Sequence, residues 1–583
     1  MNNKKIISDP VTLTVIDNKL VNICKEMGTA MMTTAFSPIF SESGDLSCAI
    51  FNKHGMMIGQ AEFCPAQLGA IIFTMEWAIK ELGIETFEQG DIVIHNDPFR
   101  GGCHIPEHSI IKPVFYDNKL FGFVANIAHI AEVGGSAPGG FVGDATEVFQ
   151  EGLRLPPIKI VKNGKDVDDV WKIILSNHRT PKATWADFKA MIGSLHLAER
   201  RLIEMLDEYG VDVTEQALND LEILSEKRMR AEILEIPDGE YSYEDFMEDD
   251  GISDKSYKIK ALVIVKGDEL LVDYTGTDLQ AKGPINATYG VTASATYNAV
   301  FNITDPNIPR NLGCYRPISI IAPPGTLVNV SYPGSSVGGN TETHPRIVEI
   351  LFGALSKAVP SKIAASDGGT CANFVFGGIH PENGETFVQY HFEGVGWGGR
   401  YQLDGNDALI IPNGGTTSKN TPIEIFDVRY PLRTDSYSLV KDSGGPGKFR
   451  GGLGTSREWT VTADEITVSA LFDRAKLKPF GLFGGQGGGL SGLYIKISGK
   501  GDWLTFSEVF KTISPSKFSN IRVKKGDKIR LVTSGGGGYG SPLERDPSKI
   551  IEDVSEGYVS LQAAKNDYHK NIQLIDNNFK IVN

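Results

Sequence analysis

Two imidazoles and one carboxylate are the residues of this sequence best suited to chemistry. His104 and Glu107 stand three residues apart in a proline-containing loop within HNDPFRGGCHIPEH (95–108), and His129 follows in AHIAEVGG (128–135). Such a set is a common ligand group for Mn, Fe or Zn, and it leaves coordination positions open for water or a substrate. The residue types therefore indicate a divalent metal site.

A predicted β-hairpin would bring these three side chains together. Residues 108–116 and 119–129 are typical of two strands joined by a turn at Asp117 and Asn118. In an antiparallel hairpin, the residues before the first strand and after the second lie at the same end. The two histidines and the carboxylate can therefore converge on one point. The alternative interpretation is that both histidines are structural and cap strand ends.

A second hairpin adds another carboxylate to the same region. Residues 46–59 contain two short apolar runs joined by a turn, and Asp45 directly precedes them, with Glu42 nearby. By the same geometry Asp45 would lie at the end of its hairpin. A carboxylate placed there could complete the ligand shell of the metal or act as a general base.

Other familiar catalytic devices are absent from the sequence. It contains no HExxH motif, no GxSxG elbow and no zinc-type pair of cysteines. Three glycine clusters occur in the C-terminal half, at 444–454, 481–492 and 534–540, and none continues into the GK[ST] of a phosphate loop. We interpret them as tight turns and bulges of β structure. If the protein depends on ATP, we expect another chain to bind it.

The predicted elements mix helices and strands without regular β-α-β alternation, which is typical of the α+β class. We expect several domains with mixed and antiparallel sheets, hairpins and packed helices, and a Gly-rich, β-dominated C-terminal half. Helices are predicted at residues 11–35, 66–84, 191–230, 287–301 and 345–359. The predicted units are an N-terminal α+β domain with the metal site (1–238), a central α+β domain (239–360), a Gly-rich β-dominated domain (361–545) and a C-terminal helical tail (546–583).

The composition argues against some classes of protein. The 583 residues include 57 Lys and Arg against 72 Asp and Glu, a net charge of −15, which argues against a nucleic-acid binder. No apolar run is long enough for a transmembrane helix, and the N-terminus does not read as a signal peptide. The six cysteines are scattered, which is typical of a reduced, cytoplasmic protein.

Six segments spread along the chain carry a family resemblance. They are NDPFRGGCHIPEH, AHIAEVGGSAPGG, QEGLRLPPIKI, YTGTDLQAKGPINA, RPISIIAPPGTLVN and SGGGGYGSPLERDP. In this colinear order they resemble the hydantoinase B/oxoprolinase family, from about residue 8 to about residue 570. That family includes the small subunits of ATP-dependent hydantoinases and caprolactamases, the C-terminal region of 5-oxoprolinase, and subunits of acetone and acetophenone carboxylases.

The resemblance implies a partner, a reaction and a ligand set. It implies a hetero-oligomer in which a hydantoinase A-like partner binds ATP and Mg and phosphorylates the substrate, while this chain hydrolyses the activated hydantoin, oxoproline or lactam. Relatives bind a divalent metal through a His-x-x-Asp pair and a later histidine, which match His104, Glu107 and His129. Asp45 matches a further acidic position of the family. We expect Zn, Mn or Fe at these residues, with Asp45 as the general base.

Two departures from the family pattern bear on the substrate. Glu107 replaces the more usual aspartate, and Cys64 and Gln67 stand where many relatives have histidine. Two alternative functions therefore stay open. The chain could be a subunit of a ketone carboxylase, or it could be a non-catalytic structural subunit that shapes the channel of its partner.

Overall fold

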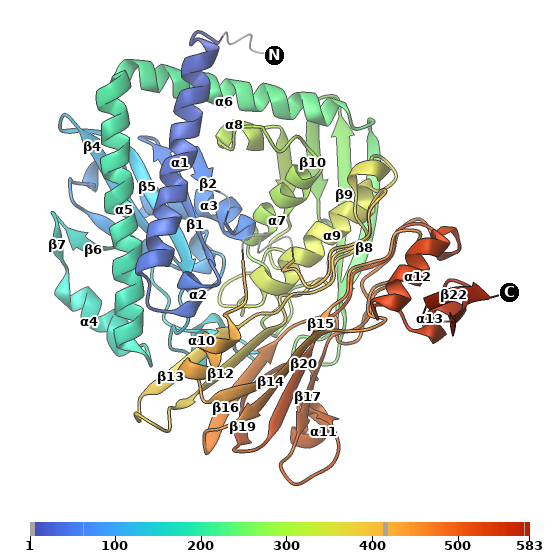
Figure 1. Ribbon diagram of the computed structural model, residues 1–583. Helices are drawn as coiled ribbons and strands as arrows, with labels where there is room; N and C mark the ends of the chain where they lie inside the picture. Colours follow the sequence, from blue (N-terminus) through green and yellow to red (C-terminus); the bar gives the residue numbers. More distant parts are fainter. Residues whose placement is uncertain (1–5, 62, 412–417, 576–577, 583) are drawn as a thin grey trace.

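The fold is described by a computed structural model covering residues 6–61, 63–411, 418–575 and 578–582. It is an α+β protein, as predicted: a sheet with long helices, a central sheet with its own helices, and a C-terminal pair of sheets follow one another along the chain (Figure 1). Among the described residues, no helix combines the length and the apolar character needed to cross a membrane.

A seven-stranded sheet forms the N-terminal part, with strand order β2-β1-β5-β4-β3-β6-β7. Its central strands are buried on both faces, because alternate residues contact two different cores. In β1, Leu46, Cys48 and Ile50 face one core and Ala49 and Phe51 face the other. The strands are β1 (Leu46–Asn52), β2 (Met57–Ala61), β3 (Ile92–His95), β4 (Glu107–Tyr116), β5 (Lys119–His129), β6 (Ile158–Lys162) and β7 (Lys165–Asp166).

Both predicted hairpins are present in this sheet. The β4–β5 turn places Asp117 and Asn118 at φ 49° and 61°, a left-handed conformation that short polar residues tolerate better than most. The β1–β2 turn is closed by a hydrogen bond from Gly55 N to Asn52 O. The residues at the ends of these two hairpins are therefore those expected from the sequence.

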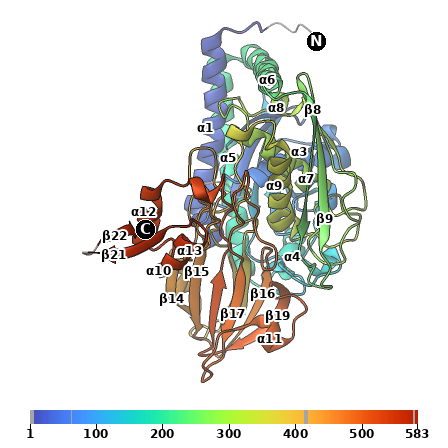
Figure 2. The same ribbon diagram turned by 90° about the vertical axis from the view of Figure 1, so that its right-hand side faces the viewer.

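Long helices cover one face of this sheet, with α1 and α5 side by side (Figures 1 and 2). Helix α1 (Pro10–Thr34) begins where the Asp9 carboxylate accepts the N–H groups of Val11 and Thr12. The single helix predicted at 191–230 is wrong. Two helices, α5 (Pro181–Tyr209) and α6 (Val211–Leu234), meet at Gly210, whose φ of 79° and ψ of 153° end one helix and start the other.

A smaller sheet and its helices follow from Gly239. The strands have the order β11-β10-β9-β8, and α7 and α9 pack between this sheet and α3 of the N-terminal part. Both helices lie close to their predicted bounds. The elements are α3 (Pro65–Leu82), β8 (Gly239–Met247), β9 (Tyr257–Lys266), β10 (Glu269–Asp273), α7 (Tyr289–Asn302), α8 (Leu312–Tyr315), β11 (Ile318–Ile321) and α9 (His344–Leu355).

Two antiparallel sheets dominate the C-terminal half, as expected. Their orders are β13-β12-β16-β19 and β14-β15-β20-β17-β18, and Phe374, Trp459 and Ile529 belong to the single core between them. The strands are β12 (Asn373–Ile379), β13 (Thr386–His391), β14 (Leu432–Leu439), β15 (Thr455–Val461), β16 (Glu465–Leu471), β17 (Gly492–Lys496), β18 (Leu504–Thr505), β19 (Lys517–Lys524) and β20 (Lys528–Val532). Further short helices are α2 (Pro38–Ser41), α4 (Asp168–Ser176), α10 (Ile423–Arg429) and α11 (Phe506–Phe510).

The C-terminal tail, which was expected to be helical, also contains strands. It contains two short helices, α12 (Pro547–Ser555) and α13 (Leu561–Asn566), and a two-stranded sheet, β21 (Asn571–Ile575) with β22 (Asn578–Val582). Tyr558 ends the first helix with a backbone bond to Asp553 O, and Ser560 caps the second. The tail packs around its own small core, which includes Ile550, Val554 and Tyr568.

The three glycine clusters pack against one another rather than serving mainly as turns. A Cβ added to Gly451 would lie 2.0 Å from Gly536 O, and one added to Gly485 would lie 2.0 Å from Gly538 O. Backbone bonds such as Gly445 N to Gly536 O cross between the clusters. The glycines are therefore needed because backbone meets backbone, at a distance that excludes any side chain.

This packing predicts a large effect of one methyl group. Gly451→Ala is expected to lower the free energy of unfolding by about 2 kcal/mol or more, because neighbouring backbone cannot move aside as a flexible side chain can. Gly501→Ala is the matched control, since a Cβ there meets nothing within 4 Å. Thermal unfolding of both variants measures the difference. Equal stabilities would contradict the close-packing account.

Candidate metal centre

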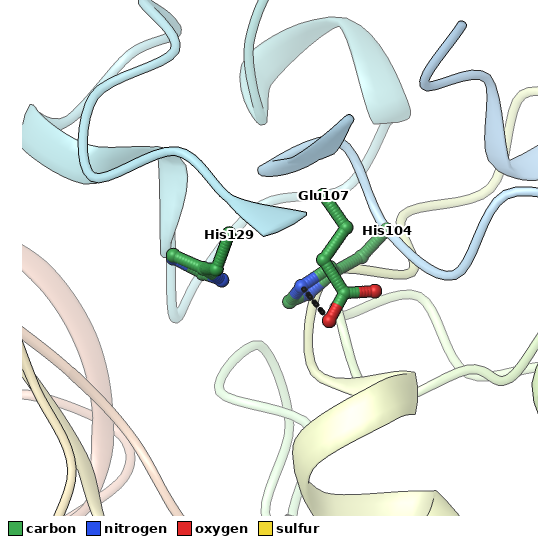
Figure 3. A group of neighbouring side chains, drawn as sticks. All are labelled: His104, Glu107 and His129. Carbon is green, nitrogen blue, oxygen red and sulfur yellow. Dashed lines mark ion pairs between the residues drawn. The ribbon is translucent and has the colours of Figure 1, made fainter. Parts of the chain in front are cut away.

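The ends of β4 and β5 bring the three predicted ligands together. Glu107 and His129 are directly opposite each other in the β4–β5 register, and His104 lies in the turn before β4, closed by Glu107 N bonding to His104 O at 3.0 Å. One donor atom from each of the three side chains lies within 4.8 Å of the others (Figure 3). The tertiary structure thus produces the convergence that the hairpin predicts.

The three side chains are almost completely buried, although all of them are polar. His104, Glu107 and His129 are 0%, 2% and 1% exposed, and Nε2 of both imidazoles and Oε2 of Glu107 have no hydrogen-bond partner in the part of the chain that the structure describes. Leaving buried polar atoms without partners is costly, so such atoms usually signal a missing ion or water. Two ring nitrogens and one carboxylate oxygen fit a divalent transition metal.

The electrostatics of the group follow from the same burial. Burial lowers the pKa of His129 well below its usual value, and the neighbouring His104 lowers it further, so this imidazole is neutral and keeps a lone pair for a metal. Burial also opposes a charge on His104, but the Glu107 carboxylate outweighs it and raises the pKa of His104. The two groups lie 3.6 Å apart, Nε2 to Oε1 (Figure 3).

Hydrogen bonds around the group orient its donor atoms. His104 Nδ1 lies 2.9 Å from Val337 O, and because a carbonyl only accepts, Nδ1 carries the proton and Nε2 of the neutral ring presents a lone pair. Glu107 Oε1 accepts from Gln67 Nε2 and Asn340 Nδ2, both at 3.1 Å. Glu107 therefore has one oxygen engaged by protein amides and the other available for a ligand.

Asp45 lies beside the three ligands without belonging to the group that meets within 4.8 Å. Its Oδ2 is 3.9 Å from His129 Nδ1, and its carbonyl accepts the N–H of His129 at 3.2 Å. Burial and the charge of Glu107 raise the pKa of Asp45 to about 7. Glu42, which the sequence also suggested, is half-buried and accepts a bond from Ser41 Oγ outside the cavity.

Both departures from the family pattern fall at this site. Cys64 lines the cavity, and burial raises the pKa of its thiol well above the usual value, which argues against a nucleophilic thiolate. Gln67 is fully buried, and its Nε2 donates to Asp45 Oδ1 at 2.8 Å as well as to Glu107. One amide thus bridges two carboxylates that would otherwise repel each other.

Removing this amide should weaken metal binding. Gln67→Met keeps the approximate volume but removes both of its hydrogen bonds, so Glu107 loses one of the two amides that fix it and is no longer bridged to Asp45. The metal dissociation constant is expected to rise about 10- to 100-fold. Zinc titration against a chromophoric chelator measures it. Gln60→Met is the control, because Gln60 is a buried glutamine outside the cavity that accepts from Tyr315. Wild-type affinity in Gln67→Met would show that the bridge has no role.

The cavity around the ligands has a volume of about 30 Å³, room for an ion and one or two waters. Its walls come from all three parts of the chain. Tyr390 stacks on His129 with centroids 4.3 Å apart and donates to Asn373 Oδ1 at 2.6 Å. The lining residues that sequence reasoning did not assign to the site are Asn340, Thr341, Cys371, Tyr390, Phe392, Ile410 and Ser418.

One feature of the backbone marks some of these residues. Asn340 and Thr341 lie in a π-helical turn (Gly339–Thr343) directly before α9. Such turns frequently occur at functional sites. The wall from the C-terminal half carries no comparable signal, because Tyr390 and Phe392 look like ordinary strand residues.

The remaining histidines of the motif are structural. His95 contacts the carbonyls of Leu155 and Arg100 through its two ring nitrogens. His108 Nδ1 contacts Pro106 O and its Nε2 accepts from Asn96. Neither histidine lines the cavity.

Known proteins resemble this chain along nearly its whole length. It is 34% identical to the B-type component of a putative D-/L-hydantoinase from a Pseudomonas species, over 97% of this chain and 95% of that protein. It is 32% identical to the beta chain of the caprolactamase of Pseudomonas jessenii, over 96% of each chain. The likeness therefore extends over all three parts of the chain.

Solved structures give the same result. The ATP-dependent caprolactamase of Pseudomonas jessenii matches with a TM-score of 0.88 at 29% identity, covering 97% of each chain. An acetone carboxylase in its nucleotide-free structure matches with a TM-score of 0.90 at 18% identity, covering 98% of this chain and 81% of that one, which shows a shared fold. The family model for Hydantoinase B/oxoprolinase matches residues 9–542. The chain therefore belongs to the Hydantoinase B/oxoprolinase family.

Proposed function

We propose that this chain is the B-type subunit of an ATP-dependent cyclic amidase and opens the ring of a hydantoin, oxoproline or lactam that a hydantoinase A-like partner has phosphorylated. The observation that carries the proposal is the buried group of His104, Glu107 and His129, with three side-chain atoms left without hydrogen-bond partners among the described residues. The hydantoinase and caprolactamase relatives support the substrate class. We place ATP and Mg on the partner, because this sequence has no GK[ST] phosphate loop.

The three ligands would hold one divalent ion, Zn, Mn or Fe. Such an ion supplies a water of lowered pKa and stabilises negative charge that develops on oxygen. The chain's own contribution is to hold Glu107 through Gln67 and Asn340. Tyr390 and Phe141 pack against the His129 ring and restrict its rotation.

Asp45 is the general base in this proposal. Its pKa of about 7 lets it accept a proton near neutral pH, and it lies at the edge of the ligand group. Water then adds to the carbon of the phosphorylated amide, the C–N bond of the ring breaks, and the ring nitrogen takes up a proton. A second water hydrolyses the resulting acyl phosphate, which releases phosphate.

Reconstitution with the A-like partner tests the function. We expect ADP release that depends on a hydantoin, oxoproline or lactam, with one ring-opened product per phosphate, and no incorporation of labelled bicarbonate. Incorporation of labelled bicarbonate into a ketone would instead identify a carboxylase subunit. Full turnover by a complex in which this chain holds no metal would indicate a structural role and overturn the proposal.

A further inference from the structure

One segment of the central part contacts two of the three proposed ligands. Val337 O accepts the proton of His104 Nδ1 at 2.9 Å, and Asn340 Nδ2 donates to Glu107 Oε1 at 3.1 Å. Each pair is separated by 233 residues along the chain. The orientation of His104 and Glu107 therefore depends on where this segment, residues 335–340, settles against the N-terminal sheet.

A single buried carboxylate holds the start of the segment. Glu151 is 0% exposed, and its Oε1 accepts bonds from Ser335 Oγ, from Ser336 N and, at 2.9 Å, from Val337 N. Its other oxygen has no hydrogen-bond partner among the residues described. The three hydrogen bonds that Glu151 Oε1 accepts thus come from three successive residues.

The backbone next to the Glu151 contact is also held by hydrogen bonds. Val148 N bonds to Pro333 O at 3.0 Å, and Glu147 forms an isolated bridge with Gly334. On the other flank, Asn286 Nδ2 donates to Ser335 O at 2.8 Å. The segment is therefore fixed at its start by side chains from two sides, Glu151 and Asn286.

We propose that Glu151 is a positioning residue for the metal centre, which acts through Val337 to fix the ring of His104. Val337 is held at both ends of its backbone: its N–H binds Glu151 and its carbonyl binds His104. Without the carboxylate, three donors lose their acceptor and the segment must find a new position. The proton on Nδ1 then loses its acceptor, and Nε2 of His104 no longer points at a fixed place.

This inference rests on the metal centre of the proposed function, and metal affinity tests it without any assay of turnover. Wild type, Glu151→Ala, Glu151→Gln and Ser335→Ala are titrated with Zn²⁺ against a chromophoric chelator, and the absorption spectrum of the Co²⁺ form is recorded. We expect a dissociation constant about 10- to 100-fold higher in Glu151→Ala, with an altered Co²⁺ spectrum. Ser335→Ala should show about a threefold rise. Glu151→Gln keeps an acceptor oxygen and should stay close to wild type.

Asp220→Ala separates positioning from general destabilisation. Asp220 is also a buried carboxylate that uses one oxygen for backbone N–H groups, those of Ile7 and Ser8, while its other oxygen has no partner among the described residues. Its hydrogen bonds go to these N-terminal residues and not to the segment 335–340, so this variant should lose thermal stability and keep wild-type metal affinity.

The outcomes are distinct. Wild-type affinity in Glu151→Ala, or equal losses in Glu151→Ala and Asp220→Ala, would overturn the positioning role alone. If Glu151→Ala fails to fold, Ser335→Ala decides: unchanged affinity and an unchanged Co²⁺ spectrum there also overturn it. A wild-type chain that binds neither Zn²⁺ nor Co²⁺ would overturn the metal centre itself and the inference with it.

Discussion

Replacing His129 by alanine is expected to remove the metal and to abolish measurable turnover of the reconstituted complex. His129 supplies one of only three donors within the 4.8 Å group, and its ring also forms the stacked wall with Tyr390. Losing a direct ligand should cost more than the 10- to 100-fold in affinity that changes around a ligand typically cost. His104→Ala should give the same result. Elemental analysis of the purified chains, wild type beside both variants, is the measurement.

A matched control distinguishes loss of a ligand from loss of a buried histidine. His95 is fully buried in the same sheet, but backbone groups occupy both of its ring nitrogens: Nε2 lies 2.9 Å from Arg100 O, and Nδ1 accepts from Asp97 N. His95→Ala should therefore lower the melting temperature and leave the metal content at about one ion per chain. Metal retained at wild-type stoichiometry in both His104→Ala and His129→Ala would show that these histidines are structural, which is the alternative that the sequence left open.

Arg457→Met is expected to lower the free energy of unfolding at neutral pH by about 3–5 kcal/mol, because it leaves a buried charge without its partner. Arg457 Nε lies 2.7 Å from Glu393 Oε2, and both side chains are buried. Burial alone would raise the pKa of Glu393, but Arg457 and His391 outweigh it and lower the pKa to about 2. Glu393 directly follows Phe392, so this ion pair also supports one wall of the cavity.

The pH dependence of this effect has a definite sign. The folded-state pKa of Glu393, about 2, lies below the ordinary value of 4.5, so its contribution is complete above the unfolded-state pKa and is lost as pH falls towards 2. In Arg457→Met the carboxyl is easier to protonate than in wild type. The stability difference between the two proteins should therefore shrink as pH is lowered from 7 to 4. Urea unfolding at several pH values measures it.

A double variant provides the test that could contradict this account. Arg457→Met combined with Glu393→Gln removes both charges while keeping the volumes similar, and it should recover part of the stability lost in Arg457→Met. If the double variant is as unstable as the sum of the two single variants, charge pairing is not the reason for the loss. In that case the packing of Arg457 over the Tyr437 ring, 3.8 Å to the centroid, would account for it.

The sequence by itself determined the elements whose signals are local. Asp9 and Pro10 mark the start of α1, and Asp117 and Asn118 mark the β4–β5 turn, because capping and left-handed turns depend on a few adjacent residues. Antiparallel pairing of the two strands then places His104, Glu107 and His129 at one end of a sheet. The residues before the first strand of a hairpin and after the second always lie at the same end. The identity of the candidate ligands therefore follows from local signals alone.

Only the tertiary structure decided what surrounds those ligands. Val337 and Asn340 reach them from 233 residues away, and no local pattern encodes a contact over such a separation. The same holds for the glycine clusters. Glycine is required there because a side chain on one cluster would clash with the backbone of another, and not because of the turns within each cluster. Gly210 shows that a boundary between helices can also escape a sequence pattern. The helical periodicity of the sequence continues through this residue, and only its backbone angles separate α5 from α6. The identity of the candidate ligands follows from residue type and strand order, whereas the orientation of their side chains depends on packing between distant segments.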